Sequence, residues 1–228
     1  MLFYKVTSEG PVINFIAEAL RSRLRGGQSV LWLVTGGSCI AVAAAVSKQL
    51  VGTPLDKLTV TPTDERYGPV GHPDSNWQQL QAAGLDLPGA KLLPVLSGKT
   101  QAVTTKEWSQ TLDAALNSAD YRLALFGIGP DGHIAGVLPH SPVVSASETA
   151  VSYQSEAIPG VRPPFQRISM SLTTITRLDE AVVYTTGEAK RPVLDRLETE
   201  QSLEDQPSQI LKRVAAVTIF NDYKGEQL

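Results

Sequence analysis

The sequence has little cysteine, no long hydrophobic run and almost no excess charge, and each shortage excludes a class of protein. Cys39 is the only cysteine among the 228 residues, which excludes an intramolecular disulfide framework and a cysteine-rich zinc site. No apolar run approaches the roughly 20 residues that a membrane-spanning helix needs. A net charge of −3 does not indicate a protein that binds nucleic acid or an anionic membrane surface.

The remaining composition is that of a soluble globular protein. Hydrophobic residues make up 42% of the chain and charged residues 19%, a balance that permits a sizeable core. The length suits one large domain or two small ones. The N-terminal residues MLFYKVTSEG do not follow the plan of a signal peptide, so we expect a cytoplasmic protein.

Apolar strand-like runs alternate with helix-forming segments along most of the chain. We expect helices near residues 11–25, 40–50, 76–83, 104–116 and 187–197. We expect strands near residues 29–34, 58–63, 92–96, 123–126, 151–153, 167–171, 181–185 and 214–220. This alternation predicts an α/β fold, with a largely parallel sheet covered by helices on both faces, in a single domain over residues 1–228. We expect loops at Pro159–Phe165 and, on the surface, over the acidic, glutamine-rich stretch Glu198–Gln209.

The most informative segment follows the strand at residues 123–126. It reads GIGPDGH and places Asp131 and His133 in a glycine-rich turn at the end of a buried strand. In open α/β sheets, ligands bind just beyond the carboxyl ends of the strands. We therefore predict that Asp131 and His133 are catalytic, although Gly-Pro-Asp-Gly is also the sequence of an ordinary structural turn.

The same glycines imitate a dinucleotide-binding fingerprint. Gly127, Gly129 and Gly132 spell GxGxxG, a motif that requires a helix to begin within the glycines. Pro130 and Asp131 stand where that helix should begin. The sequence therefore disfavours a dinucleotide site.

Other strand ends carry groups suited to anions. The strand at 29–34 runs into Thr35-Gly36-Gly37-Ser38 at the expected start of a helix, where backbone N–H groups and the helix dipole favour phosphate. The strand at 58–63 delivers Asp64-Glu65-Arg66, and Arg167 and Lys190 follow later in the chain. Arginine offers a planar fork to phosphate oxygens and lysine a point charge. Together these groups predict a phosphate clamp beside an acid–base pair.

The sequence resembles the 6-phosphogluconolactonases, which share a superfamily with the glucosamine-6-phosphate isomerase/deaminases. The motifs GGS, DERYGPVGHPDSN, GIGPDGHIAGVLP, QRIS and GEAK occur in that family's order from about Gly36 to Asp222. The resemblance implies a single α/β domain without an organic cofactor or a metal. It also implies hydrolysis of 6-phosphogluconolactone in the pentose phosphate pathway.

Two positions favour the lactonase branch of this superfamily. Deaminases of the family carry a glutamate in the segment after DGH, and Leu138 occupies that position here, while Arg66 matches the lactonase DER pattern. The chain departs from the family's GGSTP at Cys39 and Ile40, and from its DGHTAS at Ile134 and Gly136. A deaminase-like enzyme and a sugar-phosphate-binding homologue without turnover therefore remain as alternatives.

The residues lead to a hypothesis for the mechanism. We expect His133 to take a proton from the water that attacks the lactone, with Asp131 and Asp64 as candidates to orient the imidazole or the water. The phosphate is expected on Gly36, Gly37 and Ser38, with Arg167 and Lys190 closing over it. Arg66, Arg167 or backbone N–H groups are candidates to stabilise the oxyanion. We expect a sugar phosphate as the only kind of partner, bound by a monomer or homodimer.

Overall fold

A computed structural model describes residues 1–155 and 165–227. Its helices are α1 (Gly10–Arg25), α2 (Cys39–Gln49), α3 (Asn76–Ala82), α4 (Gln101–Ser118), α5 (Leu172–Ile175) and α6 (Arg191–Arg196), with 3-10 helices η2 (Glu188–Lys190) and η3 (Pro207–Arg213). Its strands are β1 (Leu2–Lys5), β2 (Val30–Val34), β3 (Leu58–Pro62), β4 (Asp64–Arg66), β5 (Lys91–Leu92), β6 (Tyr121–Phe126), β7 (Ala150–Gln154), β8 (Gln166–Met170), β9 (Glu180–Thr185), β10 (Ala216–Asn221) and β11 (Glu226–Gln227).

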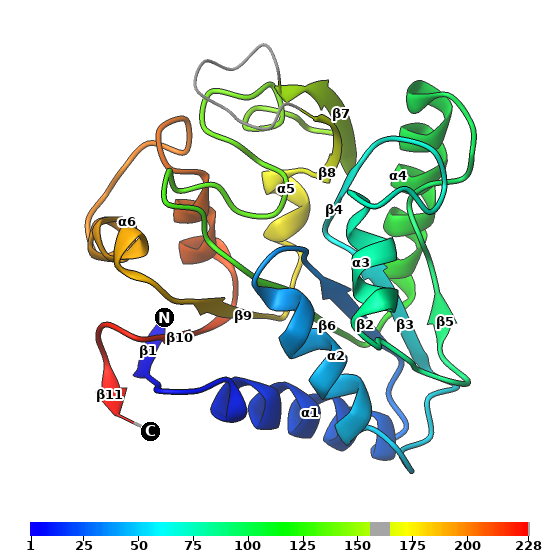
Figure 1. The fold of residues 1–228 in the computed structure, drawn as a ribbon, viewed down its shortest axis with the longest axis horizontal. Coiled ribbons are helices and arrows are strands. Elements are labelled where there is room, and N and C mark those ends of the chain that lie inside the picture. Colours follow the sequence, from blue (N-terminus) through cyan, green and yellow to red (C-terminus); the bar gives the residue numbers. More distant parts are fainter. Residues whose placement is uncertain (156–164, 228) are drawn as a thin grey trace.

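Eight of these strands form one parallel sheet in the order β11-β1-β10-β9-β6-β2-β3-β5 (Figure 1). Strands β6 and β2 lie at its middle, so the glycine-rich turns that follow them are neighbours in space. Tyr4 near the start of the chain pairs with Glu226 near its end, which brings the two termini together. The predicted parallel α/β fold is confirmed.

Both faces of the sheet are buried under helices. Along β2, Val30 and Trp32 face a core shared with α1, α2 and α3, whereas Leu31 and Leu33 face a core shared with α4, α5 and α6. Successive side chains of a strand point to opposite faces, so a strand covered on both sides is apolar throughout. This explains why β2 and β6 were recognisable in the sequence.

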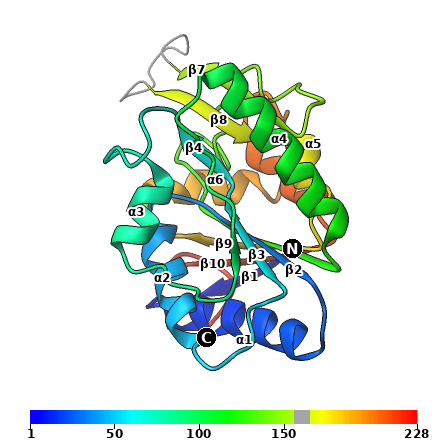
Figure 2. The same cartoon turned by 90° about the vertical axis from the view of Figure 1, so that its right-hand side faces the viewer.

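A second, antiparallel sheet of order β4-β8-β7 stands at the carboxyl-terminal edge of the main sheet (Figure 2). Only Thr63 separates β4 from β3 along the chain, and the amide of Met170 donates to the carbonyl of Thr63 at 3.0 Å. The sequence did not predict this sheet. Asp64–Arg66 was expected only at the end of the strand at 58–63, just before a loop, but its backbone pairs with β8, which lies about 100 residues further along the chain.

Further corrections concern short elements. Strands β1 and β11, helix α5 and the 3-10 helix η3 were not predicted, and β5 covers only Lys91–Leu92 instead of residues 92–96. Part of the expected surface loop Glu198–Gln209 is wrong, because Gln206 and the start of η3 are buried. Most of the expected loop at 159–165 lies outside the described residues. Within residues 1–155 and 165–227, no helix is long and apolar enough to cross a membrane.

Candidate active site

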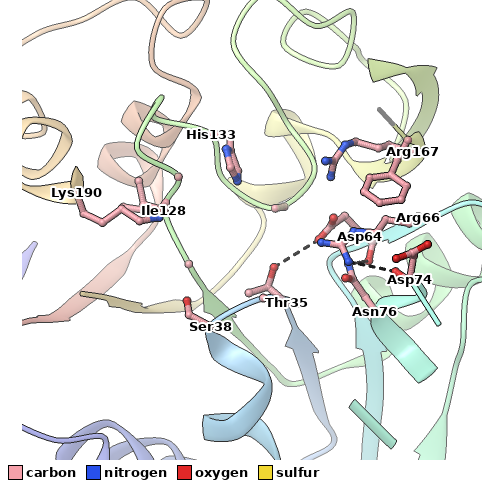
Figure 3. Close-up of a pocket in the computed structure, with 16 residues that line it drawn as sticks. Thr35, Ser38, Asp64, Arg66, Asp74, Asn76, Ile128, His133, Arg167 and Lys190 are labelled. Carbon is pink, nitrogen blue, oxygen red and sulfur yellow. Dashed lines mark hydrogen bonds between the residues drawn. The ribbon is translucent and has the colours of Figure 1, made fainter. Parts of the chain in front are cut away.

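A polar pocket of about 390 Å³ opens at the carboxyl ends of the central strands, between the two sheets (Figure 3). Its walls come from the turns after β2 and β6, from β4 and β8, and from η2. It is lined by Thr35, Gly36, Gly37, Ser38, Asp64, Arg66, Asp74, Asn76, Gly127, Ile128, Gly129, His133, Ala135, Phe165, Arg167 and Lys190. Every residue singled out from the sequence as a site candidate lines this pocket except Asp131, which contacts it through His133.

His133 and Asp131 form a hydrogen-bonded pair in the turn after β6. The Nδ1 atom of His133 lies 2.6 Å from Oδ1 of Asp131, and the backbone amide of His133 donates to the same oxygen at 3.2 Å. Burial raises the pKa of Asp131, but the hydrogen bond and charge of His133 outweigh it, and the net pKa is lowered. An ionised carboxylate only accepts hydrogen bonds, so in the neutral imidazole Nδ1 carries the proton and Nε2 keeps a lone pair.

Gly129 makes room for this pair. A Cβ atom added to Gly129 would lie 2.1 Å from Nδ1 of His133 and 2.4 Å from Oδ1 of Asp131. The amide of Gly129 donates to the carbonyl of His133 at 3.0 Å, which closes the turn. Gly129 of the GxGxxG imitation therefore serves the His–Asp pair, and the segment from Gly127 to Thr149 contains no helix, as expected.

The glycine turn after β2 meets the start of helix α2. Gly37 has φ +64°, a conformation that glycine adopts without strain, and Gly37 and Ser38 are exposed to the pocket. The side chain of Ser38 stands at the N-cap position of α2 without donating or accepting a capping hydrogen bond. The hydroxyl and the free backbone N–H groups of the 11-residue helix α2 are thus available to an anion.

Two arginines face the pocket from the second sheet. Arg66 on β4 and Arg167 on β8 stand directly opposite each other in the antiparallel register. The centres of their guanidinium groups lie 5.1 and 5.8 Å from the ring of Phe165. Among the described residues neither arginine forms an ion pair, and the buried Nε atom of each lacks a hydrogen-bond partner. Like charges directly opposite on paired strands repel, so this arrangement favours an anion between them.

Lys190 approaches from the opposite side of the pocket, and His133 lies between it and the arginines (Figure 3). Its ammonium group donates to the carbonyl of Ile128. Burial lowers the pKa of Lys190, an effect that the nearby carboxylate of Asp131 partly offsets. The three cations therefore surround the pocket and do not cluster at one point of it.

Successive side chains of β4 point to opposite faces, so its three charged residues do not all face the pocket. Asp64 and Arg66 line the pocket, whereas Glu65 is fully buried behind it. Glu65 accepts from the amides of Arg66, Asn76 and Trp77 at 2.6 to 3.0 Å and from the Ser75 hydroxyl. It therefore anchors the start of α3 to β4. The sequence offers Asp74 and Ser75 as caps of this helix, and the structure uses Ser75, whose hydroxyl accepts from the amide of Gln78.

Among the described residues, no hydrogen bond joins Asp64 to His133. Its Oδ1 atom accepts from the hydroxyls of Thr63 at 3.0 Å and Thr35 at 3.4 Å, and its side chain is almost fully buried at the pocket floor. These hydrogen bonds do not support the expectation that Asp64 orients the imidazole, and its expected action on the water stays a prediction. Its fixed carboxylate is placed to accept a hydrogen bond from a ligand or a water in the pocket.

Sequence reasoning missed several lining residues, and Asn76 is the most informative of them. Its side-chain amide donates to the carbonyl of Asp64 at 2.9 Å, and its Oδ1 atom packs where a Cβ on Gly36 would lie 2.2 Å away. Asn76 thus fixes the spacing between the glycine turn and β4. Thr35 was noted only as a neighbouring hydroxyl and Phe165 as a loop end, and Asp74 only as a possible helix cap.

Comparison with known proteins supplies the family. The model of the family described as glucosamine-6-phosphate isomerases/6-phosphogluconolactonase matches residues 10–220, nearly the whole chain. The chain belongs to this family. The match confirms the predicted resemblance to this family as a whole, which includes both the isomerases and the lactonases.

Individual relatives agree with the family assignment. A 6-phosphogluconolactonase of Caulobacter vibrioides is 32% identical over 148 residues, which cover 62% of this chain and 62% of that protein. The human GDH/6PGL endoplasmic bifunctional protein is 29% identical over 186 residues, covering 78% of this chain and 23% of that protein. The chain therefore spans less than two thirds of the length of these two relatives.

Solved structures show the same fold. A 6-phosphogluconolactonase from Shewanella baltica superposes with a TM-score of 0.80 at 18% identity, covering 97% of each chain. A monomeric glucosamine-6-phosphate deaminase superposes with a TM-score of 0.77 at 20% identity, covering 98% of each chain. The fold is thus common to both branches of the family, and only the site residues can distinguish them.

Proposed function

We propose that this protein hydrolyses 6-phospho-D-glucono-1,5-lactone to 6-phosphogluconate in the cytoplasmic pentose phosphate pathway. The observation that carries the proposal is the His133–Asp131 pair, whose free Nε2 atom belongs to a pocket lined by three cationic side chains. The names of the relatives support the same substrate. A δ-lactone is an activated ester, so one general base and one oxyanion donor suffice for its hydrolysis.

In the proposed reaction, His133 acts as the general base. Its Nε2 atom takes a proton from a water molecule while the water oxygen attacks the lactone carbonyl, and the resulting imidazolium is stabilised by the carboxylate of Asp131. The tetrahedral intermediate then breaks the bond to the ring oxygen. The imidazolium returns its proton to that oxygen, which leaves as the C5 hydroxyl and regenerates neutral His133. No covalent enzyme intermediate is needed.

The pocket offers a separate place for each end of the substrate. We place the phosphate on Gly36, Gly37 and Ser38 at the start of α2, with Lys190 and Arg167 reaching it from opposite sides. A hydrogen bond to a charged group is worth about 1.5–3 kcal/mol, so we expect Arg167→Ala to raise KM about ten- to a hundredfold. An unchanged KM would remove Arg167 from this role.

The remaining two site residues face the sugar. We propose that Arg66 stabilises the oxyanion. Its guanidinium donates to the carbonyl of Asp74 at 3.2 Å and has no other hydrogen-bond partner among the described residues. We propose that Asp64 binds a sugar hydroxyl, because threonine hydroxyls already hold its Oδ1 atom in place. The sugar phosphate is the only partner that this proposal requires, whether the protein is a monomer or a homodimer.

Deamination is the second candidate, because a deaminase shares the fold. The residue at the position of the family's deaminase glutamate is Leu138, which is 3% exposed and packed in the core. A buried leucine supplies no proton-transfer group, so we expect no ammonia release from glucosamine 6-phosphate. A binding protein without turnover is the third candidate.

The deciding experiment measures hydrolysis of freshly prepared lactone at neutral pH against an enzyme-free blank, since the lactone also hydrolyses spontaneously. We expect rapid turnover by the wild type and a loss of about 10²–10⁴-fold in kcat for His133→Ala. If His133→Ala keeps wild-type turnover, the general-base assignment is wrong. Thermal stabilisation by 6-phosphogluconate without any turnover would favour the binding protein, and ammonia release would favour the deaminase.

A further inference from the structure

Gln206 packs directly behind the turn that carries His133, although it lies 73 positions further along the chain. Gly132 has φ +92°, and a Cβ added there would lie 2.7 Å from Cγ of Gln206. The amide of Ser208 donates to the carbonyl of Gly132 at 3.0 Å. The segment that begins η3 therefore contacts the peptide immediately before His133.

The amide group of Gln206 is also bound at both ends to helix α6. Its Nε2 atom donates to the carbonyl of Val193 at 3.1 Å, and its Oε1 atom accepts from Nε of Arg196 at 2.9 Å. The side chain is 1% exposed, so it has almost no freedom to move. Helix α6 follows directly after Lys190, which contacts the opposite side of the pocket.

We propose that Gln206 is a positioning residue for the reaction. Its backbone and Cγ support the Gly132 peptide, and its amide fixes that support to the helix that follows Lys190. It thereby sets the direction of the His133 ring relative to the cation on the other side of the pocket. This inference rests on the proposed function, since it concerns the base of that reaction. Misplacing a catalytic group by about 1 Å can cost on the order of a hundredfold in rate.

The chain contains a matched control in Gln209. This residue lies in the same segment, is 5% exposed, and its Nε2 atom donates to the carbonyl of Arg196 at 2.7 Å. It stabilises η3 against α6 as Gln206 does, but its side chain is not among the nearest contacts of Gly129, Gly132 or Gly136. A purely structural role predicts the same behaviour for both glutamines, whereas a positioning role separates them.

The test compares Gln206→Met with Gln209→Met, two changes that remove the amide and keep most of the side-chain volume. We expect Gln206→Met to lower kcat about ten- to a hundredfold with KM within twofold of wild type. We expect Gln209→Met to keep kcat within twofold, with a similar fall in Tm. The His133 Nδ1 proton resonance reports the bond to Asp131 without any turnover, and we expect it to shift upfield or broaden only in Gln206→Met.

Several outcomes overturn the inference. Equal kcat in the two variants, a change confined to Tm or KM, or an unaltered Nδ1 proton resonance in Gln206→Met would each reduce Gln206 to a structural residue. If Gln206→Met does not fold, Gln206→Glu keeps the acceptor for Arg196 and is read by the same criteria. His133→Ala is measured alongside: if that variant keeps wild-type turnover, the general-base assignment of the proposed function has failed, which is distinct from a failure of Gln206 to position the base.

Discussion

Changing Asp131 to asparagine tests the central pair with almost no change of shape. The carboxylate accepts the Nδ1 proton of His133 at 2.6 Å, which leaves Nε2 as an acceptor in the pocket. The amide of asparagine can turn its NH₂ group towards Nδ1, and this favours the tautomer in which Nε2 carries the proton. An imidazole in that state cannot take a proton from water.

The expected loss of kcat follows from what the His133–Asp131 pair contributes to the rate. A positioned general base contributes about 10²–10⁴-fold, and a hydrogen bond to a charged group about 1.5–3 kcal/mol. We therefore expect Asp131→Asn to lower kcat by about 10²–10⁴. KM should stay within about threefold of wild type, because Asp131 does not line the pocket. The side chain of Asp131 is 44% exposed, so we expect little change in Tm.

The assay is initial-rate hydrolysis of fresh lactone, corrected for the spontaneous reaction, with kcat and KM determined separately. Asp113→Asn is the matched control, since Asp113 also has a lowered pKa, caused by its hydrogen bond to Arg177, and lies away from the pocket. We expect this control to keep wild-type kinetics. A kcat for Asp131→Asn above about one third of wild type would refute the role of the pair, and a loss seen only in KM would point to substrate binding.

Two further predictions concern the same pocket. We expect Gly129→Ala to lower kcat about a hundredfold or more, because the added Cβ would overlap His133 and Asp131. The control is Gly127→Ala, whose Cβ would meet nothing closer than 3.6 Å, and we expect its kcat to fall less than tenfold. Equal losses of kcat in the two variants would contradict the steric argument. Burial lowers the pKa of Lys190 below its usual 10.5, so its charge is present at lower pH and is lost as pH rises through that lowered value. We expect calorimetry to show the affinity for 6-phosphogluconate falling at a lower pH than free lysine would give, and Lys190→Arg to abolish this fall; a wild-type affinity that stays constant up to the ordinary lysine range would contradict it.

The central part of the fold was predictable because its pattern is local. Strand β2 is apolar throughout and β6 is apolar from Leu123 to Phe126, and the alanine-rich α2 follows a glycine turn, so each could be recognised without its neighbours. Strand β4 could not, because three charged residues in a row carry no strand signal. It forms a strand only through its pairing with β8, which no local pattern reveals. The short edge strand β11 and its neighbour β1, which pairs with β10, were missed for the same reason.

The residues of the site were likewise predictable only in part. His133, Asp131 and the glycine turns were identifiable because strand ends in an α/β sheet meet at one edge. The separate tasks of Asp64 and Glu65 were not, since these tasks follow from strand alternation in an element that the sequence did not predict. The contribution of Asn76 depends on an approach to Gly36 that exists only in the folded chain.

The departures from the family pattern bear on whether the protein turns over its substrate. Cys39 and Ile134 are fully buried, and burial raises the pKa of the Cys39 thiol to about 12, which makes it an unreactive core group. Ile40 packs against the core under α2, and a Cβ on Gly136 would lie 2.9 Å from both Asp64 and Ser169. Within residues 1–155 and 165–227, none of these departures lines the pocket. They alter how the turns pack and leave in place the groups assigned to the phosphate and the base, so they give no reason to prefer a protein that binds the sugar phosphate without hydrolysing it.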